Sequence, residues 1–167
     1  MGNIIGGVGN NNLGFGSLQP FEVPDAFGMV EDGIYRSSVP KAEKQFQYLK
    51  TLNLKTILFL SQEIILKSFT SFLEEEKIDL IELGLLISNR TLNDLIKEAL
   101  EILMDKSYHP IMVVCSSGIH LTGTLIGCLR KLQDWSLTSI FTEYECFAGN
   151  NSRHIDQQFI EMFDTDL

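Results

Sequence analysis

Short, continuous apolar runs recur along the chain and are typical of strands buried within a sheet. The runs 56–60 (TILFL) and 111–114 (IMVV) are almost entirely apolar, and 79–83 (DLIEL) is a weaker example. Two further short strands are expected at 27–30 and 34–37, on either side of a Glu-Asp-Gly turn sequence.

Between these runs, apolar residues recur with the 3.6-residue period of amphipathic helices. The clearest stripe predicts a helix over 93–105, with Asn93 as its cap. The other helices predicted in this way cover 41–52, 62–77, 122–133, 137–147 and 155–163. Strands that alternate with helices predict an α/β fold, with a mostly parallel central sheet flanked by helices.

The first 19 residues differ from the rest because they are rich in Gly and Asn and have no helix or strand period. We expect a flexible tail over 1–19 and a single domain over 20–167. Gly2 follows Met1, as N-myristoylation requires, but Gly6 stands where that motif has Ser or Thr.

Composition narrows the class of protein. The chain has 167 residues, a formal net charge of −9 and three cysteines. The acidic charge argues against nucleic acid as a partner, and no apolar run is long enough to span a bilayer. Three widely spaced cysteines indicate reduced thiols rather than disulfides or a zinc site. We therefore expect a soluble, cytoplasmic protein without a metal or cofactor.

One segment has the pattern of an anion-binding loop. The buried run 111–114 leads directly into Cys115, a short loop with Gly118 follows, and a helix is predicted from Thr122. Loop amides and the positive end of a helix dipole together bind anions, and a cysteine at such a place can be a nucleophile. Cys115 alone is equally compatible with a buried packing residue. The other residues that we expect in the loop are Ser116, Ser117, Gly118, Ile119, His120, Leu121 and Gly123.

Cysteine-dependent phosphatases have an arginine six positions after the nucleophile, followed by Ser or Thr. Counting from Cys115, Leu121 stands at the arginine position and Thr122 at the hydroxyl position. The sequence therefore keeps the candidate nucleophile and hydroxyl, but it lacks the arginine.

From about residue 24 to its end, the chain resembles the atypical dual-specificity phosphatases of plants and fungi. The resemblance is carried by 27–37, which includes GIYRS at 33–37, and by 52–57, 127–137 and 156–161. It implies the fold of the tyrosine phosphatase superfamily, several members of which hydrolyse inositol pyrophosphates or phosphoproteins.

The chain departs from that family at the positions that carry the chemistry. Val114 stands where the family has His, Ile119 where Lys is usual, and Leu121 where activity requires Arg. The segment 84–90 (GLLISNR) contains no carboxylate, although the family has acidic residues there that protonate the leaving group. His120 is retained, and Arg36 and Arg153 are further candidates for contact with an anion.

These losses predict a pseudophosphatase that binds an active phosphatase relative or a phosphorylated ligand. A weakly active phosphatase that acts through Cys115 on inositol pyrophosphates or phosphoproteins is the main alternative. Redox or sulfur chemistry at a reactive Cys115, as in rhodanese-like loops, is a third interpretation.

Overall fold

The computed structural model describes residues 20–84 and 91–167, and within them a five-stranded sheet has the order β1-β2-β5-β3-β4. The strands are β1 (Gly28–Glu31), β2 (Ile34–Ser38), β3 (Thr56–Phe59), β4 (Asp79–Glu82) and β5 (Ile111–Cys115). β1 pairs with β2 in antiparallel orientation, whereas the pairs β2–β5, β5–β3 and β3–β4 are parallel. The prediction of a mostly parallel sheet is thus confirmed, while the expected tail over 1–19 lies outside the described residues.

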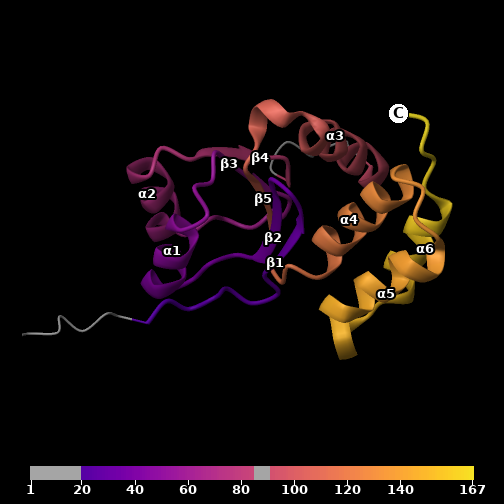
Figure 1. Cartoon of the computed structure of the whole chain (residues 1–167), viewed down its shortest axis with the longest axis horizontal. Helices are drawn as coiled ribbons and strands as arrows, with labels where there is room; N and C mark the ends of the chain where they lie inside the picture. Colours follow the sequence, from indigo (N-terminus) through magenta and orange to yellow (C-terminus); the bar gives the residue numbers. More distant parts are fainter. Residues whose placement is uncertain (1–19, 85–90) are drawn as a thin grey trace, which may run out of the picture.

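Helices cover both faces of this sheet (Figure 1). One face carries α1 (Glu43–Lys50) and α2 (Lys67–Glu75). The other face carries α3 (Leu92–Met104), α4 (His120–Leu132), α5 (Leu137–Ala148) and α6 (His154–Met162). On that side α4 is the central helix, because it packs against α3, α5 and α6. None of the helices in the described ranges is long and apolar enough to cross a membrane.

The strands alternate their side chains between two apolar clusters. Ile57, Phe59 and Met112 pack with α1 and α2, whereas Leu58 and Val113 pack with α3, α4 and α6. Strand β5 contributes to both clusters and is buried along its whole length. The carboxyl end of β5, where Cys115 lies, is therefore held in place from both sides of the sheet.

Several helix starts differ from the prediction, among them α1 at Glu43 and α4 at His120, and two of the differences have a clear physical reason. The helix predicted over 62–77 begins only at Lys67, after an extended Leu66, and Ile64 before it is 93% exposed. Adjacent Ile64 and Ile65 mimic an apolar stripe, but β-branched residues favour extended backbone, and here they connect β3 to α2. The cap of α3 is Thr91 rather than Asn93, because Thr91 and Asp94 form a reciprocal capping box.

Candidate active site

The expected anion loop connects the end of β5 to the start of α4. Cys115 is the last residue of the strand, and α4 begins at His120, two residues earlier than predicted. Ile119 precedes the helix and provides no side-chain cap. The first four amides of a helix lack intrahelical partners, so this end of α4 offers N–H groups and the positive end of its dipole to an anion.

Gly118 makes the tight turn of the loop possible. Its φ is +70°, a conformation that glycine adopts without steric cost. A Cβ atom at this position would lie 2.4 Å from the backbone nitrogen of Ser38, at the end of the neighbouring strand β2. The loop can therefore pass this close to β2 only because residue 118 has no side chain.

The thiol and the hydroxyl identified in the sequence are in contact. The Thr122 Oγ1 hydroxyl donates to Cys115 Sγ at 3.0 Å, and both side chains are buried. The contact places a hydrogen-bond donor against the sulfur of the candidate nucleophile. The structure thus brings together the two side chains, Cys115 and Thr122, that the sequence identifies as candidates.

Leu121 lies where the loop arginine would be, and its surroundings are apolar. It is partly buried and packs against the apolar cluster formed with α3, α4 and α6. The neighbouring Ile119 is also partly buried, and its amide donates to the Ser117 hydroxyl at 3.1 Å. Neither side chain can donate a hydrogen bond to a phosphoryl oxygen.

Arg36 lies beneath the loop rather than at its opening. It comes from the middle of β2, and only 1% of the residue is exposed. Its Nη2 donates to the Gly118 carbonyl at 3.1 Å, and its guanidinium carbon lies 3.7 Å from the centre of the Phe147 ring. Burial lowers the pKa of Arg36 to about 10, which leaves the guanidinium charged at neutral pH.

His120 is tied to the two C-terminal helices. Its Nδ1 lies 3.0 Å from Asp156 Oδ2, the same oxygen that accepts a hydrogen bond from the Tyr144 hydroxyl at 2.6 Å. Burial and this bond raise the pKa of Tyr144 to about 12. Arg153 donates to the Tyr144 hydroxyl through its backbone amide at 3.1 Å, while the residue is exposed. His120 therefore fixes the start of α4 to α5 and α6.

Sequence reasoning missed Ser61, which follows β3. The amide of Ser116 donates to Ser61 Oγ at 2.9 Å, and the two serine hydroxyls lie 3.1 Å apart. It also missed Asp156 and Tyr144 as partners of His120. The signal available for Ser61 was its place after a buried parallel strand, because the carboxyl ends of parallel strands meet at one edge of a sheet.

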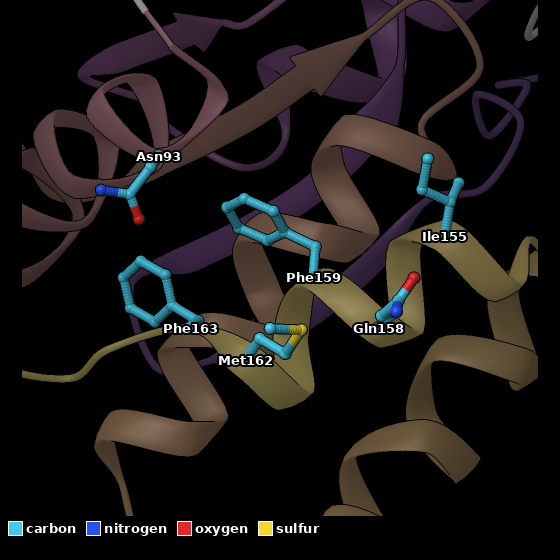
Figure 2. A pocket seen from close by; sticks show the side chains of 6 residues that line it. All are labelled: Asn93, Ile155, Gln158, Phe159, Met162 and Phe163. Carbon is cyan, nitrogen blue, oxygen red and sulfur yellow. The ribbon is translucent and has the colours of Figure 1, made fainter.

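A separate hollow of about 320 Å³ lies between α6 and the start of α3. Figure 2 shows its lining, which is mostly apolar and includes the rings of Phe159 and Phe163 together with Asn93. No residue of the Cys115 loop lines it. It is therefore distinct from the candidate active site.

Comparison with known proteins agrees with this geometry. Residues 22–167 match the model of a family described as the tyrosine phosphatase family. The chain is 45% identical over 148 residues to "Probable tyrosine-protein phosphatase DG1060" of Dictyostelium discoideum, which covers 86% of this chain and 89% of the relative. It is 44% identical over 147 residues to inositol diphosphatase DSP3 of Arabidopsis thaliana, which covers 84% of this chain and 71% of the relative.

Solved structures give the same result. The core catalytic domain of the PP-IP phosphatase SIW14 from Saccharomyces cerevisiae, in complex with citrate, superposes with a TM-score of 0.81 at 43% identity, covering 87% of this chain and 90% of that one. TpbA of P. aeruginosa has a TM-score of 0.65 at 17% identity, covers 87% of this chain and 91% of that one, and supports the fold alone. The chain thus belongs to the tyrosine phosphatase family, in the atypical dual-specificity phosphatase group that includes relatives named inositol diphosphatases.

Proposed function

We propose that this protein binds a phosphorylated ligand at the Cys115 loop and hydrolyses it poorly or not at all. The observation that carries the proposal is Leu121, an apolar residue packed against the core at the position of the loop arginine. An arginine there would bind two phosphoryl oxygens and offset the charge of the transition state. Arginines that stabilise phosphoryl transfer contribute about 10³–10⁵ in rate.

A missing proton donor adds to this loss. The segment 84–90 has no carboxylate in the sequence, and 85–90 lie outside the described residues. General acid catalysis contributes about 10²–10⁴ in rate, although the two losses need not add because the groups act together.

The backbone of the loop supports binding even where hydrolysis is impaired. Amides and the dipole of a helix N-terminus hold anions without help from side chains. Such a site would keep its phosphorylated ligand bound and would release little or no phosphate from it. Such a protein would act as a sensor of a phosphorylated ligand or as a partner of an active relative.

Weak hydrolysis through Cys115 is the second candidate function. The relatives named inositol diphosphatases favour it over complete loss of activity, and so does the intact contact between Thr122 and Cys115. Pyrophosphate bonds suit such a site better than esters do, because a departing phosphate is a weak base and needs less protonation. Inositol pyrophosphates are therefore the substrates to test before phosphoproteins.

A paired assay tests both candidates. Wild type and Leu121→Arg are compared for phosphate release from an inositol pyrophosphate and from an aryl phosphate. We expect wild type to be at least about 10³-fold slower than the Leu121→Arg variant. Cys115→Ser in each background removes catalysis by the thiol and provides the control.

The outcomes separate the two functions. Fast turnover by wild type that disappears in Cys115→Ser would contradict the binding proposal and establish the second candidate. A silent wild type that binds orthophosphate, measured by calorimetry, supports the binding proposal. A silent wild type that binds no phosphate would refute both.

A further inference from the structure

The feature that the proposed function leaves unexplained is the buried charge of Arg36. Among the described residues, no carboxylate lies within ion-pair distance of its guanidinium, and its Nε has no hydrogen-bond partner. A buried cation without a counter-ion is strongly unfavourable. Such a group is therefore a candidate for a functional role.

Arg130 shows how the same fold treats a structural arginine. Its Nε and Nη2 both bind the carboxylate of Glu143, and Nη1 binds Glu31. Nη2 also donates to the Val30 carbonyl at 2.6 Å. Arg130 is thus neutralised by two carboxylates, in contrast to Arg36.

Arg36 also sets the orientation of the loop backbone. It pulls the Gly118 carbonyl towards itself, beneath the loop. Because the peptide is planar and trans, the amide of Ile119 must then point to the opposite side, where it donates to Ser117 Oγ at 3.1 Å. A guanidinium at this position orients the peptide dipole between Gly118 and Ile119, and it places a full positive charge on the buried side of the loop.

The charged and titratable groups around Arg36 come from three elements. Glu143 and Tyr144 lie on α5, Cys115 ends β5, and Arg130 lies on α4. Glu143 is already engaged by Arg130. The counter-ion position that stays open is therefore the loop itself, on the side of Cys115.

We propose that Arg36 is a positioning residue that supplies, from beneath the loop, the fixed positive charge missing at position 121. The ligand that it favours is a phosphate or phosphate monoester dianion seated on the loop amides. The inference rests on the proposed anion-binding function, and it explains how that function survives Leu121. It assigns Arg36 no direct contact with the ligand.

The reactivity of Cys115 can report this charge without a substrate. Iodoacetate is an anion and iodoacetamide is neutral, yet both alkylate the same thiolate. Their rate ratio at one pH therefore measures the electrostatic field at Cys115 independently of how much thiolate is present. The exposed Cys146 provides an internal reference, and mass spectrometry resolves the two peptides.

We expect Arg36→Met to lower the iodoacetate-to-iodoacetamide ratio at Cys115 about tenfold and to leave the ratio at Cys146 unchanged. Arg36→Lys, which keeps the charge, should retain most of the ratio. The exposed Arg153 is the other candidate source of positive charge at Cys115. Arg153→Met should also retain most of the ratio. A folded Arg36→Met with an unchanged ratio would overturn the proposal, as would a loss caused by Arg153→Met instead.

A measurement on wild type alone guards against a variant that does not fold. Salt screens exposed charges far more than buried ones. The ratio at Cys115 should therefore persist in about 0.5 M potassium chloride if Arg36 is its source. A ratio that falls to the value at Cys146 points to a surface charge and contradicts the proposal. A wild-type Cys115 that reacts with neither reagent would contradict an open anion site, and with it the proposed function.

Discussion

Two glycines show how differently one added methyl group can act at the scale of a residue. At both Gly118 and Gly127 a Cβ would lie 2.4 Å from its nearest neighbour. At Gly127 the nearest atoms belong to the buried side chain of Ile160, the terminal methyl at 2.4 Å and Cγ1 at 2.9 Å, while alanine favours the helix by about 1 kcal/mol. At Gly118 the neighbour is backbone, and φ is +70°.

We therefore predict that Gly118→Ala lowers the free energy of unfolding by about 3 kcal/mol or more, because backbone strain and a backbone clash act together. Gly127→Ala should lower it by about 2 kcal/mol or less, because the gain in helix propensity offsets part of the cost of overpacking. Urea denaturation of the two variants measures the difference. Equal losses would show that the loop tolerates a side chain at 118.

A second prediction concerns the buried thiol of Cys128. Burial raises the pKa of Cys128 to about 12, whereas an exposed thiol titrates near 9. Above pH 9 the unfolded chain therefore releases a proton that the folded chain keeps, so the free energy of unfolding falls as pH rises. Below pH 9 this contribution is fully present.

Cys128→Ala should flatten that decline between pH 9 and 10, measured by urea denaturation under reducing conditions. The exposed Cys146→Ala is the matched control and should leave the slope unchanged. The lowered pKa of Arg36, about 10, acts in the opposite direction near the top of this range, but Arg36 is present in wild type and in both variants, so its effect cancels in the comparison. Parallel curves for wild type and Cys128→Ala would contradict the assignment.

At the scale of elements, the helix starts differ in how they are capped. Thr91 and Asp94 form a capping box at α3, whereas Ala42 at α1 has no side-chain cap although its backbone has the extended conformation of a cap. We predict that Thr91→Ala destabilises the protein by about 1 kcal/mol and that Ala42→Ser stabilises it by about 0.5–1 kcal/mol. Thermal denaturation checks both, and a destabilising Ala42→Ser would refute the capping argument.

The same scale shows what the sequence could reveal. Strands and most helices followed from local apolar patterns, because each buries one face or both. The start of α2 was predicted too early, because Ile64 and Ile65 resemble the apolar stripe of a helix although they lie in the segment between β3 and α2. The loop from Cys115 to Thr122 is contiguous, so its residues were found. The contacts of Arg36 with Gly118 and of His120 with Asp156 join positions 82 and 36 residues apart, which only folding brings together.

For the whole molecule, the two apolar clusters share one sheet, and strand β5 belongs to both. We expect them to unfold together in a single transition. Trp135 lies beside Arg130 at the end of α4, far in sequence from Phe46, which packs in the α1–α2 cluster. Phe46→Leu should therefore shift the urea midpoint of Trp135 fluorescence and that of circular dichroism equally. Separate midpoints would show that the two sides unfold independently.

Leu121 contributes to stability at the position where an arginine would contribute to phosphate chemistry. Its side chain adds to the apolar core, so restoring arginine would remove buried surface and bring a charge towards that core. Burying such an aliphatic side chain is worth about 1.5–3 kcal/mol when complete. Leu121 is partly buried, so arginine in its place would give up only part of that contribution. A return to arginine would then regain the phosphate-binding group and give up part of that stability, and the Leu121→Arg variant should show both changes.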